Sequence, residues 1–260
     1  MRIWKEAHMK IGIKDEHELK LMRESGRVLG LILHELGKHI KPGATGLELD
    51  TMAEKMMKEH HVLPSFKGYK GFKYVTCINI NEQVVHGIPT DRPFAEGDIV
   101  TVDCGVIYQG FHSDSAITKG VGKISPELAK FITTAEKALK KAIETAKPGI
   151  RIRAISGVIQ DIIEKNGYRV VHDLIGHGIG LQLHEDPQVP NFRDRDPGPI
   201  LQPGMTIAIE PIFTMGKPAV KTLQDGWTIV TVDGSPAVQV EHTIAITNKG
   251  SEILTKRPNG

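Results

Sequence analysis

Four acidic residues form two matching pairs, and their spacing favours a shared metal site. Asp103 and Glu210 each lie six residues after a glycine, in apolar runs typical of strands. Asp114 and Glu241 follow them in their respective halves of the chain, again in strand-like runs. A buried strand seldom carries a carboxylate, because an ionised carboxylate must be paired or must bind a metal. Four carboxylates in equivalent places therefore predict a common cation.

A histidine near these carboxylates would influence which cation they prefer. Oxygen ligands alone suit magnesium, calcium or manganese, whereas an added imidazole shifts the preference toward manganese, iron, cobalt or zinc. The best candidate is His177, which lies between small residues in a glycine-rich segment, 176–180, that we interpret as a turn. A packing role is the alternative for a single histidine in such a turn. The four strand carboxylates favour the role of a ligand.

The ligand set is larger than one small ion needs, particularly where carboxylates bridge, so we expect two divalent ions. Two neighbouring ions can hold a water between them, lower its pKa, and stabilise the oxyanion that forms when the resulting bridging hydroxide attacks a carbonyl. This chemistry is metal-assisted hydrolysis. His86 and His184 lie apart from the ligands and beside turn signals, as substrate-facing side chains would. Surface histidines are the alternative interpretation.

Helical spacing of apolar residues predicts four amphipathic helices, at about residues 16–40, 45–60, 125–146 and 152–166. The second begins with a threonine followed three residues later by a glutamate, which is a capping box. The third begins with a capping serine and a proline in its first turn. These signals set the helix starts.

Alternating and apolar runs bounded by turn residues predict the strands. They cover residues 75–80, 98–104, 105–118, 205–215, 227–232 and 238–247, with another strand around Val170. A turn signal at Gly110 makes a hairpin on which Asp103 and Asp114 would face each other.

An internal repeat links the two halves of the chain. The tripeptide Lys-Pro-Gly occurs at 41–43 and again at 147–149, each time before an amphipathic helix. This offset of 106 residues nearly equals the 107 between Asp103 and Glu210. We interpret the chain as two copies of an α-plus-β unit related by a pseudo-two-fold axis, with coincidence as the alternative.

Composition limits the class of protein. A chain of 260 residues is near the upper size for one hydrophobic core, which allows one large domain or two fused halves. A formal net charge of +2 does not favour binding of specific nucleic acid. The two cysteines, Cys77 and Cys104, form neither a disulfide framework nor a thiolate zinc site. Without a signal peptide or an apolar run long enough for a membrane, we expect a cytoplasmic protein.

Several sequence blocks together resemble the signature motifs of type I methionine aminopeptidases. They are residues 81–89, 103–105, 113–114, 176–180, 209–211 and 240–243, together with His184. The resemblance spans about residues 14–250, with every block in order. It implies an α+β, pseudo-two-fold-symmetric "pita-bread" fold, in which helices cover curved antiparallel sheets. It also implies one catalytic domain over 1–260, with halves at about 14–125 and 126–250 and an N-terminal extension at 1–13.

The same resemblance implies a role for each residue of the site. The residues that match the metal ligands are Asp103, Asp114, His177, Glu210 and Glu241. Among them Asp114 and Glu241 would bridge both ions, and Glu210 would exchange a proton with the bridging water. His86 matches the histidine near the scissile amide nitrogen, and His184 matches the histidine that hydrogen-bonds the carbonyl oxygen or the intermediate.

A pocket for a methionine side chain is implied as well. The residues that would line it are Tyr69, Phe72, Cys77 and Trp227, with Phe66 and Leu183 at its border. Aromatic walls and a soft thiol suit a flexible, polarizable thioether. Core packing is the alternative for these residues, above all for Phe66 and Leu183.

The implied activity is removal of the initiator methionine from nascent proteins when the second residue is small, with cobalt, manganese or iron(II) in the site. Only 33 residues separate His177 from Glu210, which leaves no room for the insertion of type II enzymes. The partner would be the N-terminal methionine of a nascent chain, and we expect a monomer with at most a transient ribosome contact. Alternatives are an Xaa-Pro aminopeptidase or prolidase, a non-catalytic pita-bread binding module, and a structural metal site.

Overall fold

All four predicted helices are present in the computed structural model, which describes residues 11–258. They are α1 (Glu16–Lys38), α2 (Gly46–Glu59), α3 (Pro126–Thr145) and α4 (Ile152–Lys165), and a short 3-10 helix, η1, spans Tyr69–Gly71. The side chains of Asp15, Thr45 and Ser125 accept a hydrogen bond from the third amide of α1, α2 and α3. Most of the predicted extension, 1–13, lies outside the described residues.

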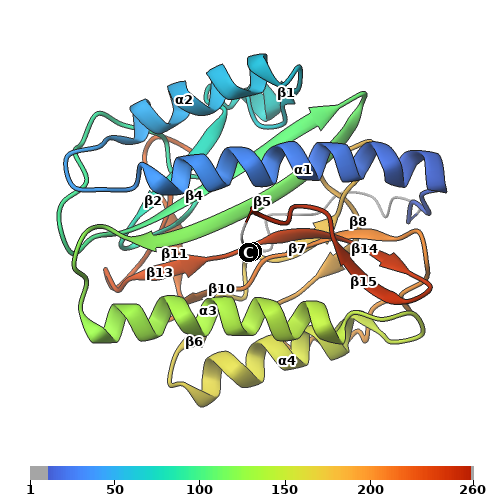
Figure 1. The fold of residues 1–260 in the computed structure, drawn as a ribbon. Coiled ribbons are helices and arrows are strands. Elements are labelled where there is room, and N and C mark those ends of the chain that lie inside the picture. The colour runs from blue at the N-terminus through green and yellow to red at the C-terminus, as the bar shows by residue number, and fades with distance from the viewer. Residues whose placement is uncertain (1–10, 259–260) are drawn as a thin grey trace.

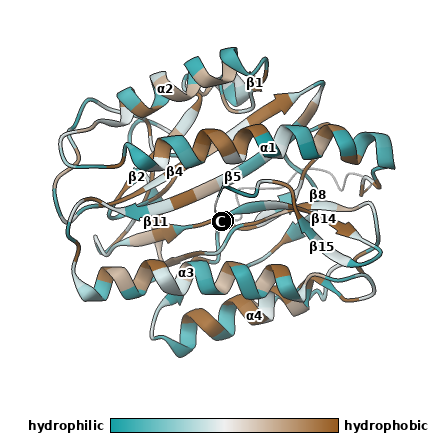
Figure 2. Ribbon diagram, viewed as in Figure 1, coloured by the Kyte–Doolittle hydropathy of each residue, from teal (hydrophilic) through white to brown (hydrophobic). Residues whose placement is uncertain are grey.

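The helices pack in two pairs on the strands. Figure 1 shows α1 with α2 along one edge of the molecule and α3 with α4 along the opposite edge, with the strands between and behind them. Apolar and polar residues alternate around each helix in Figure 2, as expected for helices with one buried face. One apolar core joins α1 and α2 to the first-half strands, and another joins α3 and α4 to the second-half strands.

The strands form four small sheets, and all pairings among the described strands are antiparallel. The first sheet holds β1 (Leu63–Pro64), β2 (Thr76–Ile80), β4 (Ile99–Tyr108) and β5 (Phe111–Gly120). The second sheet has three strands, β6 (Arg169–Val170), β10 (Ile212–Thr214) and β13 (Ala237–Gln239). The third also has three, β3 (Gln83–Val85), β11 (Val220–Thr222) and β12 (Ile229–Thr231). The last holds β7 (Gly176–Gly178), β8 (Glu185–Val189), β9 (Thr206–Ile209), β14 (His242–Thr247) and β15 (Gly250–Ile253).

The predicted repeat is present in three dimensions. Gly43 and Gly149 both have a φ of 87°. Their amides donate to the carbonyls of Phe94 and Leu201, in both cases at 2.9 Å. The helices that follow them, α2 and α4, are each 14 residues long. Equivalent turns therefore lead into equivalent helices in the two halves, which confirms the two-unit interpretation.

The predicted hairpin is present as β4 and β5, but its two aspartates do not pair directly. Asp103 lies opposite Ala116, and Asp114 lies opposite Gly105. Residues two positions apart along a strand share one face, so the two carboxylates are diagonal neighbours on the same side of the hairpin.

The predicted strands 205–215 and 238–247 are each interrupted, contrary to the sequence interpretation. The first is divided into β9 and β10 and the second into β13 and β14, and the two gaps contain Glu210 and Glu241. Pro211 has no N–H and cannot continue a ladder. At each gap the chain leaves one sheet and joins another. The breaks therefore place two of the four carboxylates where sheets meet.

None of the helices described here combines the length and the apolar character that a membrane span requires.

Two glycines in α1 allow a close approach of the chain after β15. A Cβ at Gly26 would lie 2.4 Å from the Leu254 carbonyl oxygen, and one at Gly30 would lie 2.4 Å from that of Lys256. Backbone atoms cannot easily move aside, so side chains are excluded from both positions.

We expect Gly26→Ala to lower the free energy of unfolding by about 1–3 kcal/mol, because overpacking outweighs the roughly 1 kcal/mol that alanine gains in a helix. Urea denaturation would measure the change. Lys20→Ala, at an exposed position of the same helix, is the matched control. Stability equal to or above that of the wild type in Gly26→Ala would contradict the close approach.

Candidate metal centre

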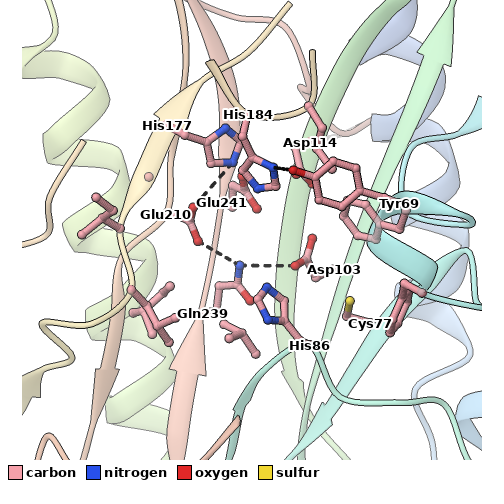
Figure 3. A pocket seen from close by; sticks show the side chains of 18 of the residues that line it. Tyr69, Cys77, His86, Asp103, Asp114, His177, His184, Glu210, Gln239 and Glu241 are labelled. Atoms are coloured by element: carbon pink, nitrogen blue, oxygen red, sulfur yellow. Dashed lines mark hydrogen bonds and ion pairs between the residues drawn. The ribbon is translucent and has the colours of Figure 1, made fainter. Parts of the chain in front are cut away.

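The five predicted ligands meet in one pocket between the two halves. Figure 3 shows their side chains converging from several strands. Asp103 and Asp114 come from β4 and β5, and His177 comes from β7. Glu210 and Glu241 come from the two strand breaks, and all five residues are at most 8% exposed.

The atoms that could bind a metal are close together. One ligand atom each from Asp114, His177 and Glu241 lies within 4.8 Å of the others. His177 Nε2 is 3.8 Å from Glu210 Oε1. Asp103 is connected to Glu210 through Gln239, whose amide nitrogen lies 3.4 Å from Asp103 Oδ2 and 3.3 Å from Glu210 Oε2 (Figure 3). The separate sequence motifs thus form a single cluster.

Burial makes ionisation of these carboxylates unfavourable. Loss of water raises the pKa of Asp103 to about 7 from an ordinary value of 3.8. For Asp114, burial and then the negative charges of Glu241 and Asp103 raise the pKa well above normal. The pKa values of Glu210 and Glu241 are raised in the same way, by burial first and by neighbouring carboxylates second.

The donor set fits divalent cations. Three carboxylate oxygens, Asp103 Oδ1, Asp114 Oδ1 and Glu241 Oε1, are buried without a hydrogen-bond partner among the described residues. Buried acceptors without donors are costly, and like charges repel one another. Cations would satisfy the free oxygens and offset the repulsion. Oxygen ligands with one imidazole suit ions such as manganese, iron and cobalt.

The hydrogen bond made by Nδ1 of His177 leaves the lone pair of Nε2 available. Nδ1 lies 2.9 Å from the Gly178 carbonyl oxygen, which can only accept, so Nδ1 carries the hydrogen. Burial lowers the pKa of His177 to about 4, so the ring is neutral near pH 7. The lone pair of Nε2 then faces Glu210 and is available to a metal.

The part of the glycine-rich segment that holds His177, Gly176–Gly178, is strand β7 and not the predicted turn. A Cβ at Gly176 would lie 2.4 Å from the Ala208 carbonyl oxygen, and one at Gly178 would lie 2.2 Å from that of Asp186. The glycines are needed because neighbouring strands approach closely, which is why the turn interpretation was wrong.

His86 and His184 also line the pocket, as the sequence predicted. His184 Nδ1 lies 2.9 Å from the Tyr69 hydroxyl, and the His184 ring centroid is 4.3 Å from that of His177. His86 follows β3 with a left-handed φ of 57°. Burial lowers the pKa of His86 to about 4. Burial, and then His177 and His86, lower the pKa of His184 well below its usual value.

Apolar side chains form another wall of the same pocket. Phe72 and Trp227 meet edge to face with centroids 5.0 Å apart. Cys77 lies opposite Asp103 in the β2–β4 ladder, and burial, with Asp103 next, raises the pKa of its thiol well above normal. The thiol is therefore uncharged. Phe66 and Leu183 line the pocket as well as packing in the core, so their two interpretations do not exclude each other.

The sequence interpretation missed two parts of the site. Gln239 is 2% exposed and points between the carboxylates of Asp103 and Glu210. It lies two residues before Glu241, so strand alternation could have identified it. The second part is a buried ion pair, Lys14 Nζ to Glu185 Oε2 at 2.6 Å, which holds the segment beside His184. Its partners are 171 residues apart, and no sequence signal connects them.

Removal of one buried charge should stabilise the protein in the absence of metal. Carboxylates with a raised pKa bind more protons in the folded state than in the unfolded state, so stability is lost as the pH rises from about 4 to about 7. In EDTA at pH 8, we expect Asp114→Asn to raise the free energy of unfolding by about 1–3 kcal/mol, with the gain shrinking on acidification.

Asp50→Asn is the matched control for Asp114→Asn. Urea denaturation would measure the stability of both variants. Asp50 is also a buried carboxylate, but it accepts hydrogen bonds from the Val75 amide and from the amide and hydroxyl of Thr76. Its substitution should destabilise the protein. A loss of stability in Asp114→Asn under the same conditions would mean that its carboxylate is satisfied without metal.

The sequence profile described as "Metallopeptidase family M24" matches residues 20–248. Methionine aminopeptidase 1 of Bacillus subtilis is 48% identical over 243 residues, which cover 94% of this chain and 98% of that protein.

Solved structures show the same fold. The methionine aminopeptidase of Thermotoga maritima superposes with a TM-score of 0.93 at 44% identity, over 95% of this chain and all of that chain. Prolidase from Pyrococcus furiosus shares the fold with a TM-score of 0.75 at 24% identity, and the match covers 95% of this chain and 66% of that one. The fold is the pita-bread fold that the sequence motifs implied.

Proposed function

The chain belongs to metallopeptidase family M24, and we propose that it is a methionine aminopeptidase that removes the N-terminal methionine from new polypeptides when the second residue is small. The observation that carries this proposal is one pocket with two kinds of wall. Five buried ligands stand on one side, and an aromatic and thiol-lined surface stands on the other. Together they would hold a scissile peptide bond next to a thioether side chain.

Two divalent ions would be held by the five ligands, with manganese, cobalt or iron(II) as candidates. We assign Asp114, on β5, and Glu241, in the break between β13 and β14, as the ligands that would bridge the two ions. Asp103 and Glu210 would then complete the oxygen ligands, one for each ion, and His177 would supply the nitrogen ligand. Bound ions would supply a water of lowered pKa and positive charge for the oxyanion of the transition state.

The remaining residues would bind and orient the peptide. Neutral His184 can donate from Nε2 to the carbonyl oxygen of the substrate when the Tyr69 hydroxyl donates to Nδ1. Neutral His86 would lie near the scissile amide nitrogen. We assign Glu210 as the carboxylate that would exchange a proton with the attacking water. Phe72 and Trp227 would contact the methionine side chain.

The wider setting is part of the same proposal. The 260 residues would act as one catalytic domain, with its two halves at about 14–125 and 126–250. We assign the protein to the cytoplasm as a monomer that acts on nascent chains, with at most a brief ribosome contact. The two buried, free cysteines support a reducing compartment.

A peptide assay tests the activity. The purified protein, reduced and supplied with manganese or cobalt, should release the first residue from Met-Ala-Ser but not from Met-Leu-Ser or Ala-Pro. Release from Ala-Pro alone would favour an Xaa-Pro peptidase. No methionine release from either methionine peptide would refute the proposed activity and favour a binding module.

Substitutions separate the ligands from the substrate-facing histidines. We expect His86→Ala and His184→Ala each to lower kcat by about 100-fold or more while manganese affinity stays near that of the wild type. Glu210→Gln should remove nearly all turnover, and Asp114→Ala should weaken manganese binding. Calorimetric titration and steady-state kinetics give the two readouts. Loss of metal affinity in the histidine variants equal to that in Asp114→Ala would place them among the ligands instead.

A further inference from the structure

The two halves meet along a seam formed by β5 and the β13–β14 segment. One backbone hydrogen bond crosses it directly, from the Glu241 amide to the Ala116 carbonyl at 3.0 Å. Side-chain hydroxyls make further links: Ser115 Oγ donates to the Glu241 carbonyl at 2.6 Å, and Thr243 Oγ1 donates to the Asp114 carbonyl at 2.8 Å. The seam is therefore joined largely by side chains, and it carries Asp114 and Glu241.

The chain after β15 returns to this seam. We call residues 254–258 the C-terminal strap. In Figure 1 it runs from β15 to the centre of the molecule, between α1 and α3. Thr255 Oγ1 accepts from the Thr243 amide at 3.1 Å and lies 2.8 Å from His242 Nδ1. The close contacts of Gly26 and Gly30 with this segment hold it against α1.

Arg257 extends from the strap into the seam and contacts both halves. Its Nη2 donates to Ser115 Oγ at 3.0 Å and to the Ala116 carbonyl at 2.9 Å. The same nitrogen lies 3.3 Å from the Glu241 carbonyl, and Nη1 lies 3.0 Å from His242 Nε2. Guanidinium groups only donate, so His242 accepts through Nε2.

The contacts of Arg257 surround two proposed ligands. Ser115 and Ala116 directly follow Asp114 on β5, and the third acceptor is the carbonyl of Glu241 itself. A planar guanidinium fixes several acceptors in a rigid fork, which a lysine cannot do.

We propose that Arg257 is a positioning residue of the metal centre, which sets the separation of Asp114 and Glu241 by holding the Glu241 carbonyl and the two residues after Asp114 together across the seam. This inference rests on the proposed ligand roles of those two carboxylates. Arg257 does not contact the substrate pocket, so it acts through the ligands. A purely structural strap would instead affect stability alone.

The test compares Arg257→Met and Arg257→Lys with Arg23→Met. Arg23 pairs with Glu252 at 2.9 Å and so attaches the same terminal region to α1 at a distance from the seam. Manganese binding to the metal-free proteins would be measured by calorimetric titration, and the cobalt-loaded proteins would be compared by visible absorption. Peptide kinetics and thermal unfolding complete the set.

We expect Arg257→Met to raise the manganese dissociation constant about 10- to 100-fold, the usual range for residues that orient ligands. The cobalt spectrum should change, and kcat should fall with little change in KM. Arg257→Lys should fall between Arg257→Met and the wild type. Arg23→Met should keep wild-type metal affinity and spectrum even where its melting temperature is lower.

Wild-type manganese affinity and cobalt spectrum in folded Arg257→Met would overturn the inference, as would an equal loss of affinity in Arg23→Met. If Arg257→Met does not fold, Arg257→Lys decides the question by the same criteria. Failure of the wild-type protein itself to bind manganese or cobalt would be a different result, because it would refute the proposed metal centre.

Discussion

Four carboxylates share one buried pocket, and this electrostatic conflict is the constraint on which the rest of the structure depends. Each would be stable in water, but burial and mutual repulsion raise the pKa of all four. The folded chain bears that cost because two separate apolar cores, one on each side of the seam, stabilise the halves. The cost is also what gives the site its affinity for cations, since a bound cation relieves both the repulsion and the free acceptors.

The two halves hold their carboxylates in different ways, although the fold is a repeat. Asp103 and Asp114 lie in unbroken strands of one hairpin, where the ladder fixes both of them. Glu210 and Glu241 lie at strand breaks, where the backbone leaves its ladder and a longer side chain reaches the centre. Side-chain groups therefore replace the missing ladder bonds, for example Asn191, which donates to the Glu210 carbonyl at 2.9 Å. The second half depends more on such contacts than the first.

Local signals predicted most of the elements and pointed to the carboxylates and the histidine that the fold brings together. Caps and apolar spacing marked the four helices, the hairpin turn placed Asp103 beside Asp114, and the signature blocks indicated the remaining site residues. The strand breaks, the strands β1, β3, β7, β8, β11 and β15, and the Lys14–Glu185 pair were not predicted. Each of these depends on which backbone lies nearby in three dimensions, and one sequence does not contain that information. Glycines at 176 and 178 illustrate the difficulty, because a turn and a close strand contact require the same residue type.

Burial shifts the histidines and the carboxylates in opposite directions, and both shifts favour the proposed chemistry. It lowers the pKa of His86 and His177 to about 4, which keeps their rings neutral and able to accept or to ligate. It raises the pKa of Glu210, so this carboxyl group binds a proton more readily until a cation takes the place of that proton. The wall formed by Phe72 and Trp227 lines the same pocket, so the surface that would contact a methionine side chain lies beside these shifted groups.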